Sequence, residues 1–314
     1  MNNLNVNMKN RTIEMTKKFA AASSKFGTEE YKILQEVRRD YPSYKVVTIT
    51  RKASKSDSSA FKGLTYEYME KYSVMIVNSQ FKREKEIEAL NNFCKYSVDG
   101  IFLACTVHQD VLDQFKPILR DKNIPLVLLE ARLHSDDYNY IMIDDEAGMV
   151  QAIEYLLQKG YGRIGFMSEY VTDVMRNAMF ISAIRKNGLD PADNPIYTHP
   201  TKRFEAAGYE LIQQILKDPN RPRAFLAGYD DMAIGAIRAA EEAGFSVPRD
   251  FAIIGNDNIR EAPFLHTSLS TLSPPIERMV ELGVRMMLDC IREHDLDSIH
   301  RVTLKPELIL REST

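Results

Sequence analysis

Residues 224–257 read AFLAGYDDMAIGAIRAAEEAGFSVPRDFAIIGND and contain one helix pattern between two strand patterns. Ala224–Ala227 and Phe251–Gly255 are short apolar runs, and the segment between them repeats its apolar residues at helical spacing. Gly244 can take the left-handed conformation that ends a helix, and Pro248 follows in the lead into the next strand. A strand, a helix and a second apolar strand in this order predict a β-α-β unit of a parallel sheet.

The same alternation extends in both directions along the chain. Apolar, β-branched runs predict further strands at Tyr44–Thr50, Ser73–Asn78, Val98–Ala104, Pro125–Leu129, Tyr140–Ile143, Arg163–Met167, His300–Leu304 and Leu308–Arg311. Amphipathic segments predict helices at Arg83–Tyr96, Glu146–Gln158, Met175–Lys186, Arg203–Leu216, Met232–Ala243 and Ile276–Ile291. The fold class is therefore α/β with doubly wound sheets, in which ligands bind at the carboxyl ends of the strands.

Length and composition describe an ordinary globular protein. The chain has 314 residues, of which 44% are hydrophobic and 27% charged, so it can bury a substantial core. No apolar run is long enough to span a membrane, and the asparagine-rich start does not resemble a secretory signal, which predicts a cytoplasmic protein. The cysteines and histidines are dispersed without metal-ligand spacing, and no nucleophile, nucleotide or metal motif is present. We therefore predict no enzyme activity, no catalytic residue, no metal and no cofactor.

Charge is distributed unevenly along the chain. Residues 1–72 contain 14 Lys/Arg against 8 Asp/Glu, whereas residues 73–314 contain 27 against 36. A basic N-terminal piece on an acidic body is typical of a nucleic-acid-binding appendage, but a solvated helical face or a tail gives the same pattern.

Two loops after predicted strands carry side chains suited to ligand binding. Arg176 lies in the first turns of the helix after Arg163–Met167, where its planar fork of donors suits hydroxyls, carboxylates or phosphates. The alternative is a surface arginine that pairs with Asp173. Asp257 follows the strand Phe251–Gly255 as a ligand acceptor, or it forms an Asx-turn with local backbone N–H groups.

Two other polar positions have structural alternatives. Tyr229 follows the strand Ala224–Ala227 and could be a rim aromatic, while Asp230 or Asp231 could cap the next helix. The adjacent carboxylates Asp144 and Asp145 are solvated charges or helix caps.

Several motifs in order resemble the LacI/GalR family of transcriptional regulators from about residue 73 to residue 313. They are Asn78-Ser79, Val98-Asp99-Gly100-Ile101, Ile124-Pro125-Leu126-Val127, Ile143-Asp144-Asp145-Glu146-Ala147-Gly148, Arg163-Ile164-Gly165-Phe166, Thr172-Asp173-Val174-Met175-Arg176, Tyr229-Asp230-Asp231-Met232-Ala233-Ile234-Gly235-Ala236, Ala243-Gly244-Phe245-Ser246-Val247-Pro248-Arg249-Asp250 and Ile254-Gly255-Asn256-Asp257. Each motif is weak alone, but their order and spacing make the resemblance specific.

The resemblance implies two doubly wound α/β lobes of the type I periplasmic-binding-protein-like architecture, with a small helical N-terminal segment. It places the sensor N-lobe at 44–143 and 272–294, and the sensor C-lobe at 144–271 and 295–314. It also implies dimerisation and a small effector, commonly a sugar, in the cleft. The implied effector contacts are Arg176, Asp257, Tyr229 and Asp144.

The chain departs from the family pattern at two places. The family usually has Asn-Asp where this chain has Tyr229-Asp230, so the effector could differ or the cleft could be narrower. The family's helix-turn-helix headpiece, its hinge helix and the first strand and helix of its sensor lobe are not recognisable. Tyr44–Thr50 with a short helix at Phe61–Tyr72 could replace that first unit; otherwise the N-lobe would keep an exposed apolar flank.

Residues 1–43 are then a basic helical segment and a degenerate headpiece. Helices at Thr12–Ser24 and Thr28–Arg39 fit a loose helix-turn-helix, and a plain helical hairpin equally well. In the first case Lys25, Lys32, Arg38 and Arg39 would contact operator phosphates.

The leading hypothesis is an effector-responsive LacI-type regulator that is homodimeric, binds operator DNA and has no membrane association. The alternative is a cytosolic small-molecule binding protein with the same sensor fold and no functional headpiece.

Overall fold

The computed structural model describes residues 4–7, 12–25, 28–40, 45–49, 72–80, 82–104, 108–130, 137–171, 173–293 and 296–314. The chain divides into two compact units, Met1–Ser73 and Val74–Thr314. In the described part of the chain, no helix is both long and apolar enough to cross a bilayer.

The first unit is a small α/β structure rather than a pair of helices. Its sheet has the order β1-β2-β3, with β1 (Leu4–Asn7) antiparallel and β3 (Lys45–Ile49) parallel to β2 (Thr12–Thr16). Helices α1 (Lys17–Ser23) and α2 (Glu29–Asp40) connect β2 to β3. The prediction of a helix beginning at residue 12 is therefore wrong, because residues 12–16 pair on both sides in a sheet.

The strand predicted at residues 44–50 is present as β3, but it does not start the sensor lobe. It pairs with β2 around a core of Ile13, Phe19 and Leu34, so the assignment of residues 44–73 to the N-lobe is corrected. The helix predicted at residues 61–72 lies almost wholly outside the described residues.

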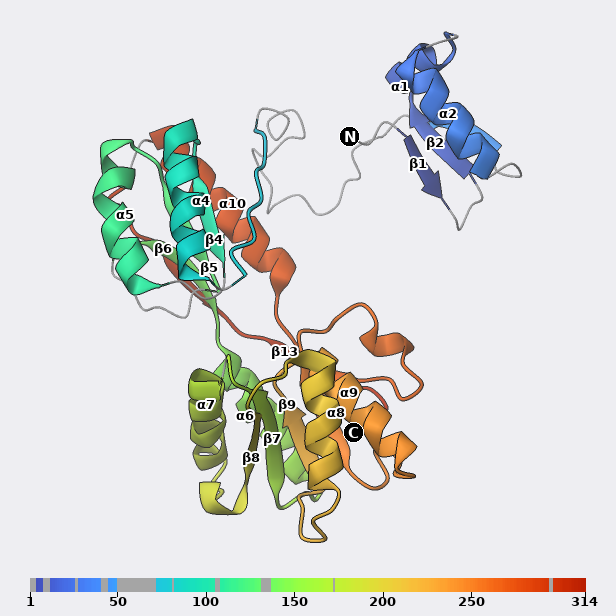
Figure 1. Cartoon of the computed structure of the whole chain (residues 1–314), viewed down its shortest axis with the longest axis vertical. Coiled ribbons are helices and arrows are strands. Elements are labelled where there is room, and N and C mark those ends of the chain that lie inside the picture. The colour runs from blue at the N-terminus through green and yellow to red at the C-terminus, as the bar shows by residue number, and fades with distance from the viewer. Residues whose placement is uncertain are drawn as a thin grey trace. The chain divides into compact units, whose positions relative to one another are not determined.

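The second unit contains two lobes, each with a sheet that is parallel except for the antiparallel edge strand β13 of the C-lobe (Figure 1). The N-lobe sheet has the order β12-β6-β5-β4 and the C-lobe sheet the order β13-β11-β10-β9-β7-β8. The N-lobe strands are β4 Ile101–Ala104, β5 Leu126–Leu129, β6 Asn139–Ile143 and β12 Arg301–Leu304. The C-lobe strands are β7 Ile164–Glu169, β8 Ile196–His199, β9 Ala224–Ala227, β10 Ala252–Asn256, β11 Ser270–Ser273 and β13 Glu307–Ile309. The predicted α/β class with two doubly wound lobes is confirmed.

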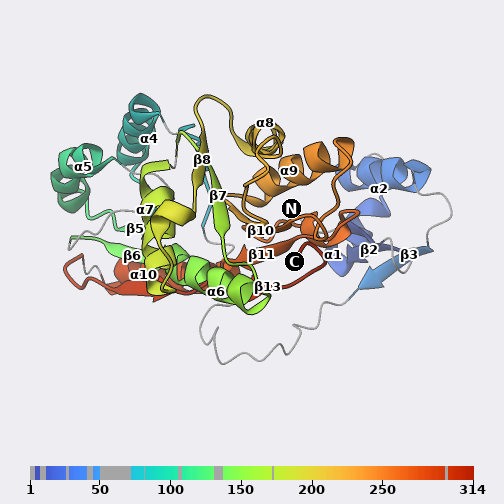
Figure 2. The same cartoon turned by 90° about the horizontal axis from the view of Figure 1, so that it is seen from below.

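Helices cover both faces of each sheet. They are α4 Arg83–Tyr96, α5 Gln109–Asp121 and α10 Ile276–Glu293 on the N-lobe, and α6 Asp145–Gln158, α7 Asp173–Lys186, α8 Phe204–Ile215 and α9 Asp230–Glu242 on the C-lobe. Figure 2 shows α8 and α9 on one side of the C-lobe sheet and α6 on the other. Met279 and Met286 of α10 pack against Val127 and Ile141, so this amphipathic helix belongs to the N-lobe core, as predicted.

The chain passes between the lobes three times, and one predicted boundary is wrong. β12 pairs in parallel with β6 of the N-lobe, whereas β13 pairs with β11 of the C-lobe. Residues 301–304 therefore belong to the N-lobe, because the register from Arg301 to Leu304 satisfies the free edge of β6.

The segment predicted as a strand at Ser73–Asn78 is extended but has no strand partner among the described residues. Val74 and Ile76 are 82% and 89% exposed, and the N-lobe sheet ends at β4. A strand requires a neighbour to complete its hydrogen bonds. The strand at residues 44–50 was expected to be this neighbour. It pairs with β2 in the first unit instead, so Val74 and Ile76 have no strand beside them among the described residues.

Close packing of α8 against α9 gives the first testable prediction. An ideal Cβ on Gly235 would lie 2.0 Å from the carbonyl oxygen of Glu205, and one on Gly208 would lie 1.9 Å from that of Met232. Because these atoms belong to helix backbones, Gly235→Ala should destabilise the fold by about 2–3 kcal/mol in urea unfolding.

Gly162→Ala is the matched control for Gly235→Ala. A Cβ there meets nothing within 4 Å, so the substitution should change stability by less than about 0.5 kcal/mol. Equal unfolding midpoints for the two variants would contradict the close approach of α8 and α9.

Candidate functional site

Three of the predicted ligand-binding residues lie at the carboxyl ends of adjacent C-lobe strands. Arg176 is in the first turns of α7 after β7, Tyr229 follows β9, and Asp257 follows β10. Since β7, β9 and β10 are neighbours in one parallel sheet, the three residues gather at a single edge.

Arg176 is 94% buried, so the alternative of a surface arginine is not supported. Its Nη1 donates a hydrogen bond to the carbonyl of Gly228, and its guanidinium carbon lies 4.7 Å from the centre of the Tyr229 ring. Its Nε has no hydrogen-bond partner among the described residues. A buried donor without a partner is costly, and a ligand acceptor at this position would remove that cost.

Asp257 is a hydrogen-bond acceptor that is close to other protein groups and is still accessible to solvent. Its residue surface is exposed, yet desolvation by the neighbouring protein raises the pKa of its carboxyl to about 7. The positive charge of Arg176 opposes this rise, while the carboxylates of Asp230 and Asp145 add to it. An accessible, partly desolvated carboxylate is suited to accept hydrogen bonds from a small ligand.

The turn that carries Asp257 is held by other groups, so the Asx-turn alternative is not supported. The following N–H groups, of Asn258 and Ile259, donate to Thr271 Oγ1 at 3.2 Å and to Asp230 Oδ2 at 2.9 Å. Asp230 is completely buried and also accepts a hydrogen bond from the Thr271 hydroxyl at 2.6 Å. Burial raises the pKa of Asp230, whose role is to fix the turn rather than to bind ligand.

Glu169 was not singled out in the sequence, although it is the second residue after the predicted strand Arg163–Met167. It is fully buried, and its carboxylate accepts hydrogen bonds from the Tyr229 hydroxyl at 3.2 Å and from the Val171 N–H at 2.9 Å. The Arg203 Nε lies 3.3 Å from the same carboxylate. Glu169 therefore joins the strand end of β7 to Tyr229 and to the start of α8.

Arg203 and Phe204 complete this cluster from the end of β8. The Arg203 guanidinium carbon lies 4.5 Å from the centre of the Phe204 ring, which meets the Tyr229 ring edge-on at 5.4 Å between centres. Sequence reasoning missed both residues because β8, a short edge strand, was not predicted. Tyr229 is thus flanked by Arg176 and Phe204, which places an aromatic surface beside the free donor.

Asp144 has a structural role. Its side chain accepts a hydrogen bond from the Ala147 N–H at 2.9 Å and caps α6. The capping alternative is therefore correct for one carboxylate oxygen, and no contact joins Asp144 to Arg176 or Asp257 among the described residues. Asp145, the first residue of α6, acts on the pKa of Asp257, so the start of α6 lies near the site.

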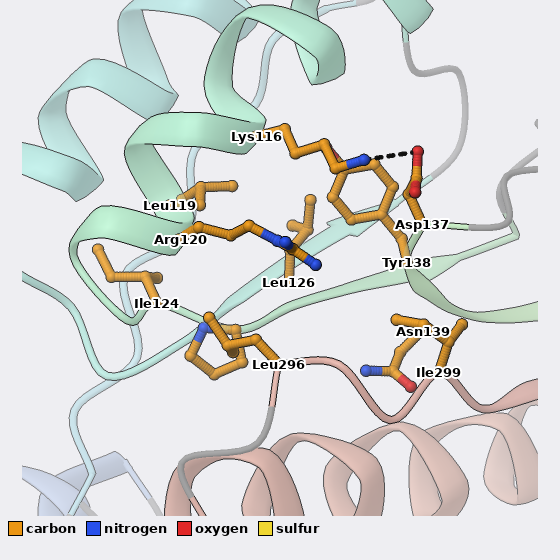
Figure 3. Close-up of a pocket in the computed structure, with 11 residues that line it drawn as sticks. Lys116, Leu119, Arg120, Ile124, Leu126, Asp137, Tyr138, Asn139, Leu296 and Ile299 are labelled. Carbon is orange, nitrogen blue, oxygen red and sulfur yellow. Dashed lines mark ion pairs between the residues drawn. The ribbon is translucent and has the colours of Figure 1, made fainter.

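A separate small cavity lies at the opposite, amino ends of β5 and β6 (Figure 3). Its volume is about 40 Å³, and Lys116 and Asp137 form an ion pair of 2.7 Å at its edge. A space of this size holds a few water molecules, so it is too small for a sugar. Among the described residues, no cluster of His, Cys, Asp or Glu is arranged to hold a metal ion.

The basic residues predicted to contact DNA all lie in the first unit. Lys32, Arg38 and Arg39 are exposed on α2, and Lys25 is exposed in the turn before it. Acidic residues of the same helix, such as Glu29 and Glu36, are exposed as well.

The sequence resembles known proteins over much of its length. The profile of the periplasmic binding protein-like domain matches residues 153–314. The protein "HTH-type transcriptional repressor PurR" of Serratia proteamaculans is 32% identical over 252 residues, covering 78% of this chain and 72% of the relative. The PurR of Yersinia pestis bv. Antiqua is 31% identical with the same coverage.

Solved structures share the fold at lower identity. A LacI family transcriptional regulator from Enterococcus faecium with bound ribose is 24% identical, covers 79% of this chain and 89% of its own, and has a TM-score of 0.67. The transcription regulator CcpA of Lactococcus lactis has a TM-score of 0.66 at 21% identity with the same coverage. A LacI family regulator from Lactobacillus casei with bound glucose has a TM-score of 0.65 at 21% identity, covering 79% of this chain and 90% of its own.

Proposed function

Because the chain belongs to the LacI/GalR family of transcriptional regulators, we propose that it binds a small effector between its two lobes and thereby changes its affinity for operator DNA. The observation that carries this proposal is the buried guanidinium of Arg176, with its Nε unbonded, beside Tyr229 and Asp257. The Arg176 guanidinium and the Asp257 carboxylate follow strands β7 and β10, which flank β9 in one sheet, and together they can bind a ligand without catalysing a reaction, which agrees with relatives that are repressors.

The effector that suits this site best is a sugar or a sugar-like molecule. Vicinal hydroxyls can accept from Arg176 and donate to Asp257 at the same time, and an apolar sugar face can rest on Tyr229. Bound ribose and glucose in the Enterococcus and Lactobacillus relatives support this class.

The regulatory step would be a shift between open and closed arrangements of the lobes. Three chain segments connect the lobes, around residues 144, 274 and 305, and these could act as hinges. Effector binding favours the closed state only by the difference in affinity between the two states. A homodimer in the cytoplasm would pass this shift to the DNA-binding part, with Lys25, Lys32, Arg38 and Arg39 as phosphate contacts.

The alternative function is a small-molecule sensor that does not read DNA. The strand at Thr12–Thr16 favours it, because the first helix of the expected helix-turn-helix is reduced to the seven residues Lys17–Ser23. Both functions share the effector site and differ only in the role of the first unit.

Two measurements on the full chain test these functions. Calorimetric titration with ribose, glucose and a panel of other monosaccharides should find a ligand that binds and raises the melting temperature. Retention of labelled genomic fragments at low and moderate salt should then find a fragment that the ligand releases or recruits. Ligand binding without specific DNA retention would favour the sensor, and no binding by any carbohydrate would reject the effector class.

A further inference from the structure

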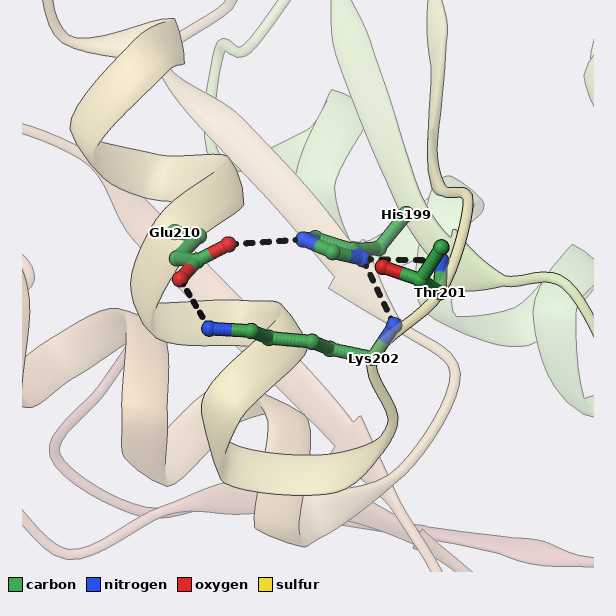
Figure 4. Close-up of polar contacts among 4 residues, drawn as sticks. All are labelled: His199, Thr201, Lys202 and Glu210. Carbon is green, nitrogen blue, oxygen red and sulfur yellow. Dashed lines mark hydrogen bonds and ion pairs between the residues drawn. The ribbon is translucent and has the colours of Figure 1, made fainter.

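His199 ends strand β8 as a buried imidazole, and it is the centre of a hydrogen-bond cluster beside the effector site. Its Nε2 lies 2.9 Å from Glu210 Oε2 on α8 (Figure 4). Its Nδ1 accepts hydrogen bonds from the backbone N–H groups of Thr201 at 3.3 Å and Lys202 at 2.9 Å. The Lys202 ammonium pairs with the other oxygen of Glu210, so helix, turn and imidazole are tied together.

These contacts require one protonation state of His199. Because Nδ1 accepts from two N–H groups, it carries no proton, and the ring proton is on Nε2, where it is donated to Glu210. A second proton would have to bind at Nδ1 and point at the N–H groups of Thr201 and Lys202. The protonated ring therefore cannot keep the turn in this conformation.

The turn from residue 199 to residue 203 positions part of the effector site. It delivers Arg203 to Glu169, at 3.3 Å, and leads into Phe204, which contacts the Tyr229 ring. Phe204 has a φ of 52°, a left-handed conformation that an aromatic residue adopts only under constraint. The hydrogen bonds to His199 are thus a condition for the placement of both residues.

We propose that neutral His199 is a latch that holds Arg203 and Phe204 against Glu169 and Tyr229, and that protonation opens it. The charged groups around the imidazole are Glu210 on α8, Lys202 in the turn and Glu169 at the register-paired position of β7. A proton bound at Nδ1 would displace the two N–H groups of the turn, so acid would act on the turn through this nitrogen. The inference builds on the proposed effector site and makes His199 a positioning residue for it, but its test needs no effector.

Hydrogen exchange on the full chain, read by mass spectrometry and corrected for intrinsic rates, tests the latch. Between about pH 8 and about pH 5.5, protection at Thr201 and Lys202 should fall at least about fivefold in the wild type. Protection at the Val171 N–H, which donates to Glu169, should fall with it. His199→Asn offers an amide oxygen near the position of Nδ1 that does not titrate, so its protection should stay constant over the same range.

Two further variants separate the latch from general acid effects. His266→Asn removes an exposed histidine of the same lobe and should behave as the wild type. Glu210→Gln keeps an acceptor for Nε2 and leaves both hydrogen bonds to Nδ1 in place, so the loss of protection in acid should remain. A wild-type turn whose protection does not change with pH would overturn the latch, and so would an equal loss of protection in His199→Asn. Failure of all carbohydrates to bind would remove the effector proposal and leave this result unaffected.

Discussion

Replacing Asp257 with asparagine is expected to lower effector affinity by at least about 100-fold at about pH 8. The carboxylate accepts hydrogen bonds from ligand hydroxyls, and charged hydrogen bonds contribute about 1.5–3 kcal/mol each. Asn256 donates to Asp257 Oδ1 at 2.7 Å, and asparagine keeps an acceptor there, so the turn should be preserved. Calorimetric titration of both proteins with the carbohydrate found for the wild type measures the loss.

The pH dependence of the same variant gives an independent result. The pKa of Asp257 is raised from 3.8 to about 7, so the wild-type carboxyl is protonated below that pH and must lose a proton to bind as the charged acceptor. Wild-type affinity should therefore rise with pH and become constant above about 7, by up to about tenfold per pH unit below it. In Asp257→Asn the amide does not titrate, so the rise of effector affinity with pH that comes from this carboxyl should disappear.

The raised pKa also fixes the sign of the effect on stability. A carboxyl that binds its proton more tightly in the folded state stabilises the fold fully below pH 3.8, and this stabilisation is lost as pH rises through about 7. Asp257→Asn should therefore reduce the decline in stability of the unliganded protein between these values. The change should be small, since water reaches this side chain.

Asp193→Asn provides the control for Asp257→Asn. Asp193 is an exposed residue of the same lobe, so its replacement should leave affinity and the pH profile unchanged. If Asp257→Asn binds the effector as tightly as the wild type does, the carboxylate does not contact the effector.

Arg176→Ala should lower effector affinity by at least about 100-fold, by a different route. It removes a buried donor fork and its contact with the Tyr229 ring, which together orient the ligand. It also removes the positive charge that opposes the raised pKa of Asp257, so the pH at which affinity becomes constant should move upward. Arg176→Lys keeps the charge without the fork and should restore the pH profile more fully than the affinity.

Arg185→Ala is the matched control, because Arg185 is exposed in the last turn of the same helix. It should bind the effector as the wild type does. Since Arg176 has an unbonded buried Nε, Arg176→Ala should unfold near the wild-type midpoint. A large loss of stability together with the loss of affinity would mean that Arg176 serves mainly to hold the lobe together.

The sequence determined the second unit well because local patterns and topology agree there. The helix Arg83–Tyr96 was predicted with the bounds that the structure gives, and so was the buried strand Ala224–Ala227. The strand predicted at Phe251–Gly255 is present one residue later, at Ala252–Asn256. Parallel strands carry their loops to one edge, so Arg176, Tyr229 and Asp257 could be chosen from their positions after strands. These are properties of the chain over a few residues at a time.

Only the tertiary structure decided which strands pair and which side chains meet at the site. Strand type can be read locally, but the neighbour of a strand cannot, because pairing joins residues that are far apart in sequence. Lys45–Ile49 therefore appeared to begin the sensor lobe, yet it pairs with Thr12–Thr16. In the same way, Glu169 and His199 acquire their roles from Tyr229 and Glu210, which only the packing of α8 and α9 on the sheet brings to them.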